Sequence, residues 1–256
     1  MNAVGTPYLD RPRLLSLGGV LMIALAAWLA LGLLSAAGGH TGWGNALSRS
    51  VALSGVAAWP GLTAIWLLMS VAMMLPTAAP VIDIYVRLSR RIEDRRAAHV
   101  TAFAGGYLGA WGLLAVAAGG AQAFLSEPIA ARATTLPAAW PAGGILLLAG
   151  LYQFTPLKQA CLTLCRNPLT FFMSHWRDGI GGASRMGLHH GAVCIGCCWA
   201  LMGLMFLSGA MNLAWMATLG LVMLLEKTAP GAGRIGRLLG LAMALAGAGL
   251  ILSEYV

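Results

Sequence analysis

Residues 60–82 read PGLTAIWLLMSVAMMLPTAAPVI and contain no charged side chain. A helix of about 20 such residues crosses the hydrocarbon core of a bilayer, which is about 30 Å thick. The whole chain has this character, since 59% of its residues are hydrophobic and only 9% are charged. A soluble domain of this size could not bury so much apolar surface in one core. Alternation of period two is absent, so the sequence predicts an all-α, polytopic transmembrane helical bundle.

Further apolar runs on both sides of this stretch predict further membrane spans. We expect about seven spans, at residues 14–37, 60–85, 99–122, 142–160, 188–209, 212–226 and 236–253. The sixth is the shortest, and six spans remain if it re-enters the membrane beside the fifth. The first exceeds the apolar core of a signal peptide, about 7–15 residues, so we expect an uncleaved anchor. The segments 38–59, 123–141 and 161–187 are expected to be loops, which makes residues 1–256 a single integral membrane domain.

The basic residues predict the orientation of the chain in the membrane. Of the 16 Lys and Arg residues, all but Arg49 and Arg132 fall in the N-terminal segment or in the second, fourth and sixth loops. Short cytoplasmic loops carry such an excess of positive charge. We therefore expect a cytoplasmic N-terminus and a C-terminus on the opposite side. The same distribution accounts for the net charge of +8 without nucleic acid as a partner.

All five cysteines lie between residues 161 and 198. Cys161 and Cys165 are spaced i, i+4 and share one helix face if the fourth span continues that far. One face of the fifth span carries an imidazole, three thiols and a thioether, at His190, Cys194, Cys197, Cys198 and Met202. An isolated cysteine in a membrane helix is usually a small packing residue. Several soft donors on one face favour a metal site over packing alone.

Thioethers are added by the second span, at Met69, Met73 and Met74. At a rise of about 1.5 Å per residue, Met74 lies about 21 Å from the outer end of its span, and Cys194 lies about 9 Å inside the cytoplasmic start of the fifth span. Both positions match the depth of Cys161 and Cys165. Three prolines at this level, Pro76, Pro80 and Pro156, free backbone carbonyls and bend helices. We therefore expect the motifs to form one site near the cytoplasmic side.

The donor types predict which metal this site prefers. Thiolates and thioethers are soft donors that select Cu(I), whereas a tetrahedral set of cysteine and histidine also suits Zn(II). The methionines favour Cu(I), and cytoplasmic thiols are kept reduced, as Cu(I) binding requires. Copper is therefore the expected ion and zinc the alternative. The spacing of Cys194 and Cys197 also fits a thiol redox relay.

Other polar residues give weaker indications. Glu226 and Lys227 end the sixth span, and we expect them to lie at the membrane surface with their aliphatic stems in lipid. His40, His99 and His175 stand apart from the cysteines and are not expected to be ligands. Phosphate-binding loops and Ser-His-Asp spacings are absent, so the sequence gives no support to an ATPase or a hydrolase.

Several motifs resemble those of a bacterial family of predicted metal-binding integral membrane proteins, some members of which are labelled copper chaperones. The matching motifs are Met69-x-x-x-Met73-Met74-x-Pro76, Tyr152-Gln-x-Thr155-Pro156-Leu-Lys158 followed by Cys161 and Cys165, Gly191-x-x-Cys194-x-Gly196-Cys197-Cys198-Trp199, Leu201-Met202, Met211-Asn212 and Glu226-Lys227. The resemblance covers roughly residues 60–230. It implies metal binding at the cysteine motifs and a multi-pass protein of the bacterial inner membrane.

The leading hypothesis is a copper-handling membrane protein that binds Cu(I) through this cysteine, methionine and histidine cluster. We expect it to deliver the ion to a membrane cuproenzyme or to transport it, and we do not expect an enzyme. The alternative is a membrane oxidoreductase or assembly subunit that uses its thiols or another metal such as zinc. Expected partners are the lipid bilayer, the metal ion and a membrane cuproenzyme.

Overall fold

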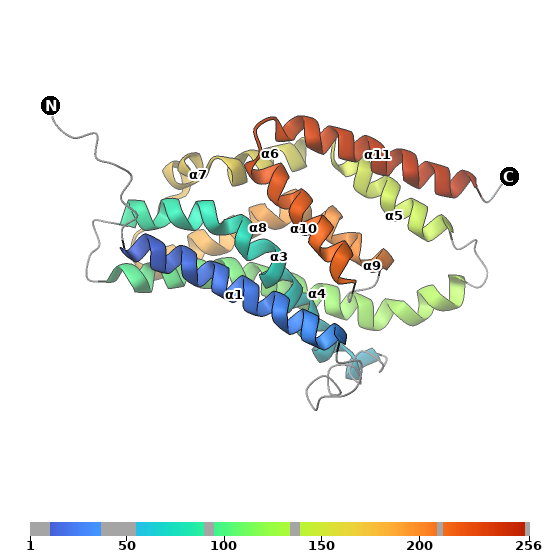
Figure 1. Cartoon of the computed structure of the whole chain (residues 1–256), viewed down its shortest axis with the longest axis horizontal. Helices are drawn as coiled ribbons and strands as arrows, with labels where there is room; N and C mark the ends of the chain where they lie inside the picture. Colours follow the sequence, from blue (N-terminus) through green and yellow to red (C-terminus); the bar gives the residue numbers. More distant parts are fainter. Residues whose placement is uncertain (1–10, 37–54, 90–94, 134–138, 209–211, 254–256) are drawn as a thin grey trace.

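The computed structural model describes residues 11–36, 55–89, 95–133, 139–208 and 212–253; Arg49, Arg90, Arg91 and Met211 lie outside them. All regular structure in these ranges is helical, which confirms the predicted all-α class. The elements are α1 (Arg11–Ala36), the short 3-10 helix η1 (Gly55–Ala57), α3 (Trp59–Leu88), α4 (Arg96–Ala133), α5 (Ala139–Tyr152), α6 (Pro156–Arg166), α7 (Pro168–His175), α8 (Gly179–Gly203), α9 (Met205–Ser208), α10 (Leu213–Thr228) and α11 (Ala232–Leu252). Figure 1 shows their arrangement.

Five of the described helices, α1, α3, α4, α8 and α11, are long and apolar enough to cross a membrane. α1 and α11 expose large apolar side chains such as Leu15 and Leu238, which suits contact with lipid rather than water. The chain is therefore a membrane protein. α5 is apolar but has 14 residues, and α10 has 16 residues. The number of seven spans and their orientation stay predictions.

Helix α3 is the most buried of these spans, and a proline within it is compensated by a neighbouring helix. Pro76 has no backbone N–H, so the Ala72 carbonyl one turn earlier lacks its usual partner. The indole N–H of Trp28 on α1 donates to this carbonyl at 3.0 Å. The expectation of a freed backbone carbonyl is confirmed here for Pro76, and the hydrogen bond to this carbonyl links α1 to α3.

Helices α4 and α8 pack closely because glycines lie at their contact. A Cβ atom on Gly187 would lie 1.9 Å from the Phe103 carbonyl oxygen, and one on Gly106 would lie 2.0 Å from the Ser184 carbonyl oxygen. Small residues allow membrane helices to approach to such backbone contact. This crossing holds α8, with its cysteines, against the middle of the bundle.

Replacing Gly187 with Ala is expected to lower the free energy of unfolding by about 1–3 kcal/mol, because the added methyl must push α4 and α8 apart. The matched control is Gly112→Ala, since a Cβ there meets no atom within 4 Å. Its effect should stay within about 1 kcal/mol, and a better helix former makes stabilisation the expected sign. Thermal unfolding in detergent micelles compares the two variants. Equal effects at both positions would contradict a tight crossing.

The predicted fourth span, 142–160, is wrong because the helix breaks within it. α5 ends at Tyr152, and Pro156 starts α6 as its first residue. Proline suits that position, since its missing N–H is not needed there, and the Thr155 side chain caps the helix by accepting from the Lys158 backbone N–H. Cys161 and Cys165 therefore lie on a separate short helix. The predicted loop 161–187 is also wrong, because α6, α7 and the start of α8 occupy most of it.

The fifth span starts earlier than predicted, and the third ends later. α8 begins at Gly179 rather than near residue 188, because its polar first turns continue the same helix; α4 extends to Ala133. Cys194 therefore lies beyond the middle of α8 and not near its start. Met74 lies near the middle of α3, so the cysteine and methionine motifs still meet at one level.

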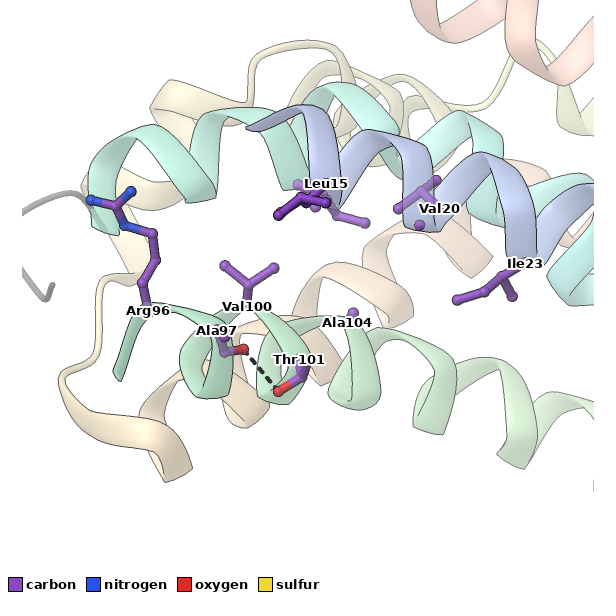
Figure 2. A pocket seen from close by; sticks show the side chains of 11 residues that line it. Leu15, Val20, Ile23, Arg96, Ala97, Val100, Thr101 and Ala104 are labelled. Carbon is purple, nitrogen blue, oxygen red and sulfur yellow. Dashed lines mark hydrogen bonds between the residues drawn. The ribbon is translucent and has the colours of Figure 1, made fainter. Parts of the chain in front are cut away.

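A cavity of about 720 Å³ opens between α1, α3 and α4, as Figure 2 shows. Its walls are mainly apolar, with Leu15 and Ile23 from α1 and Val100 from α4. Arg96 lies at one end. Within the described ranges, its lining contains neither cysteine nor methionine, so the cavity is separate from the sulfur residues described next.

Candidate metal centre

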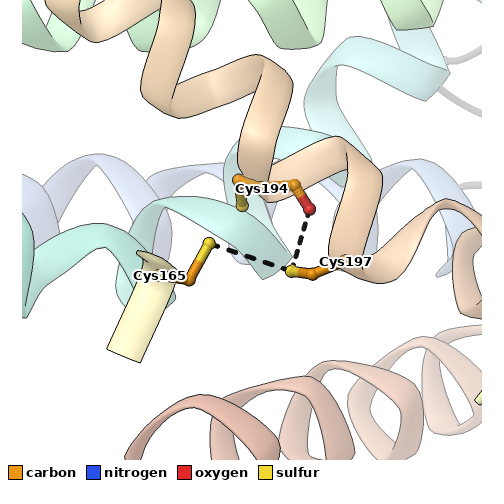
Figure 3. Close-up of side chains that lie close together, drawn as sticks. All are labelled: Cys165, Cys194 and Cys197. Atoms are coloured by element: carbon orange, nitrogen blue, oxygen red, sulfur yellow. Dashed lines mark hydrogen bonds between the residues drawn. The ribbon is translucent and has the colours of Figure 1, made fainter. Parts of the chain in front are cut away.

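Three thiols from two helices converge in the core of the bundle. The Sγ atoms of Cys165 on α6 and of Cys194 and Cys197 on α8 all lie within 4.8 Å of one another, and all three residues are buried. The Cys165 and Cys197 sulfurs are 3.9 Å apart. Figure 3 shows the three side chains pointing toward one another. Every one of the five cysteines is free, so no disulfide competes with metal binding.

Local sequence explains how α6 reaches α8. The break before Pro156 lets α6 run separately from α5, and Gly196 removes the side chain that would keep it away. A Cβ atom on Gly196 would lie 2.7 Å from the Cys161 sulfur. The Tyr152 hydroxyl at the end of α5 donates to the Gly196 carbonyl and fixes the same junction. Cys161 is only partly buried, at the edge of the three-thiol group.

A second sulfur pair lies beside these thiols. Cys198 Sγ is 3.9 Å from the Sδ atom of Met74 on α3. The thiols of Cys197 and Cys198 both donate to the Cys194 carbonyl at 3.0 Å. The predicted meeting of the cysteine face of α8 with α3 and with the Cys161 and Cys165 segment is therefore present, and this face does not point to lipid.

The other methionines of the predicted set make no sulfur contact of this kind within the described residues. Met73 packs against Gly220 of α10, whose Cβ position is 3.6 Å from the Met73 Cγ atom. Met69 and Met202 are buried in the same core, but in the described residues neither shares a hydrogen bond with a thiol. Successive residues of a helix point about 100° apart, and of the Met73 and Met74 pair, Met74 is the one whose sulfur lies 3.9 Å from the Cys198 sulfur.

His190 is buried one turn before Cys194, among aromatic rings. Its ring centroid lies 4.9 Å from that of Phe171 and 6.0 Å from that of Tyr107. Its Nδ1 atom is buried and has no hydrogen-bond partner among the described residues. A buried polar nitrogen without a partner is costly, and a metal ion or a hydrogen-bonded water would satisfy it.

Two polar groups contact the Cys194 sulfur. The Tyr107 hydroxyl lies 3.2 Å from it and also donates to the Met74 carbonyl at 3.1 Å. The Lys227 ammonium donates to it at 3.1 Å and to the Thr77 hydroxyl at 2.9 Å. Cys194 is thus in contact with a hydroxyl group and with an ammonium group, and the ammonium group is its hydrogen-bond donor.

The prediction that Glu226 and Lys227 form a surface pair is wrong. Both are buried, and they turn to different partners: Lys227 to Cys194, and Glu226 to Lys158 at 2.8 Å. Lys158 also donates to the Gln153 side chain. The sequence carried a usable signal, because charged residues in an apolar helix are costly and are kept where they have a function.

Comparison with known proteins assigns the family. A family model described as PpoB2, copper chaperone, matches residues 63–250. This chain belongs to the PpoB2 family. The matched range contains all five cysteines and Met74, and it confirms the resemblance that the motifs indicated. No curated protein and no solved structure matches the chain. The PpoB2 assignment and the cysteine cluster together support metal binding by this membrane protein.

Proposed function

We propose that this PpoB2 protein is a membrane-embedded copper chaperone that holds Cu(I) at Cys165, Cys194 and Cys197. The observation that carries the proposal is the convergence of three buried, free thiols from two helices. Cu(I) binds few ligands and prefers soft ones, so two or three thiolates suffice. Sulfurs 3.9 Å apart need only a small adjustment to bridge an ion with bonds of about 2.3 Å.

The remaining soft donors would have supporting roles. Cys198 and Met74 form an adjoining pair that can receive the ion or complete its coordination. His190 adds its Nδ1 atom, which has no hydrogen-bond partner among the residues that the structure describes. Cys161 is partly exposed beside the thiols and suits a transfer step between this site and another protein. Met69, Met73 and Met202 would shape the surrounding core.

Delivery is the favoured role, with a membrane cuproenzyme of the bacterial inner membrane as recipient. The family description and the five apolar helices support this role. A carrier for delivery needs one site from which the ion leaves readily, and a small cluster of soft ligands with a partly exposed thiol at its edge meets that need.

Metal analysis of protein purified anaerobically under reducing conditions tests the proposal. We expect about one copper ion per chain with little zinc, since the cluster offers soft sulfur ligands. Zinc at the same stoichiometry would favour the alternative of a zinc-dependent membrane subunit. If the protein binds no copper after incubation with Cu(I), the proposal is wrong and the cysteines serve only in packing.

Met74→Leu is expected to weaken Cu(I) affinity by up to about tenfold, because it removes a thioether beside Cys198 while keeping the packing volume. Met73→Leu is the matched control and should have little effect, since Met73 faces α10. Competition against a Cu(I) chelator measures both affinities. If Met73→Leu loses more Cu(I) affinity than Met74→Leu, Met73 is the methionine that contributes to the site.

Reporter fusions test the orientation that the basic residues predict. A reporter fused at the N-terminus should be active in the cytoplasm, and one fused at the C-terminus should be active only outside it. A C-terminal fusion active in the cytoplasm would show an even number of spans and remove either α10 or α11 from the set that crosses the membrane.

A further inference from the structure

Lys227 places a positive charge directly against the proposed copper ligands. It lies near the end of α10, and 8% of its surface is exposed. Its Nζ atom is 3.1 Å from Cys194 Sγ and 3.9 Å from Met74 Sδ. The Thr77 hydroxyl accepts a third contact at 2.9 Å and holds the ammonium group in place.

The acidic group next to Lys227 in the sequence does not neutralise it. Both carboxylate oxygens of Glu226 accept from Lys158, at 3.0 and 2.8 Å, and both of these side chains are almost fully buried. Asp83 on α3 is paired with Arg13 and Arg87. Within the described residues, the group that contacts the Lys227 ammonium and can carry a negative charge is the Cys194 thiol.

We propose that Lys227 supplies the counter-charge for a Cu(I) thiolate complex at this site, an inference that rests on the proposed function. Cu(I) carries one positive charge, so binding by two thiolates leaves a net charge of −1 and binding by three leaves −2. A buried anion without a partner is strongly disfavoured. The fixed ammonium group offsets one of these negative charges at close range.

Lys227 acts as a positioning residue and not as a ligand, because an ammonium group has three donors and no lone pair for the metal. Its N–H groups donate to the thiolate sulfur and orient it, as hydrogen bonds around metal ligands commonly do. Lys158 has the same charge but points to Glu226, so the two buried lysines of this core have separate roles.

Anaerobic Cu(I) competition titrations on the full-length protein in micelles test this role. Lys227→Leu should weaken Cu(I) binding by about 10- to 100-fold, since it removes a charge a few ångströms from the anionic complex. Lys227→Gln, which can still bond to Thr77, should show a similar loss and serves if the Leu variant does not fold. Lys227→Arg keeps the charge, so its Cu(I) affinity should stay within a few-fold of that of the wild type.

The control is the double variant Lys158→Met with Glu226→Leu, which removes a buried lysine and its partner together and should leave Cu(I) affinity near that of wild type. Unchanged or tighter Cu(I) binding by both Lys227→Leu and Lys227→Gln would overturn the inference. A Lys227→Arg variant that binds Cu(I) as weakly as these neutral variants would also overturn it. The proposed function is judged separately, by Cu(I) binding to the wild type. Wild-type protein that binds no Cu(I) would overturn both proposals.

Discussion

Cys194→Ser is expected to abolish high-affinity Cu(I) binding. Cys194 belongs to the three-thiol group, and its sulfur is the one that both Lys227 and Tyr107 contact. Serine offers a hard hydroxyl oxygen in place of a soft thiolate, and Cu(I) has little affinity for such a donor. Substitution of a residue that only hydrogen-bonds to a metal ligand commonly lowers metal affinity by about 10- to 100-fold. Loss of the ligand itself should therefore lower Cu(I) affinity by at least about 100-fold.

Cys161→Ser is the matched control for Cys194→Ser. It makes the same chemical change at a partly exposed cysteine outside the three-thiol group, and equilibrium affinity should change little. Competition against a Cu(I) chelator measures both variants, and circular dichroism verifies that they stay helical. If Cys161→Ser removes binding and Cys194→Ser does not, the ion is held at the edge of the bundle and the proposed centre is wrong.

Glu226→Leu is expected to lower the free energy of unfolding by about 3–5 kcal/mol. The change leaves the Lys158 ammonium buried without its carboxylate, and Lys158 has only 1% of its side chain exposed. Its hydrogen bond to Gln153 remains, but a neutral amide cannot balance the charge. Unfolding of the purified protein by heat or by SDS, monitored by circular dichroism, gives the difference from wild type.

A second substitution separates the charge effect from a loss of packing. Adding Lys158→Met to Glu226→Leu removes both charges, so an apolar pair of similar volume replaces the ion pair and most of the lost stability should return. If the double variant is less stable than Glu226→Leu alone, the contribution of Lys158 comes from its aliphatic packing, and the ion-pair explanation fails.

The sequence by itself determined the fold class and the composition of the site. Charge-free runs such as 60–82 require membrane helices, because backbone groups in lipid must be satisfied within each helix. The spacing from Cys194 to Cys198 puts three thiols on one side of α8 whatever surrounds it, since helix geometry is local. Thr155 and Pro156 also carried a local signal for a new helix, a cap followed by proline, which should have divided the predicted span 142–160.

Only the tertiary structure decided which side chains face one another. Residues 60–82 of α3 have apolar side chains on every side, so their pattern could not show that Met74 lies against Cys198 and Lys227 while Met73 packs against Gly220. Lys158 and Glu226 are far apart in the sequence, and adjacent residues of α10 send one charge to α6 and the other to Cys194. Hydrophobicity measures the cost of burying each charge, but only the packing of α6, α8 and α10 supplies the partners that offset it.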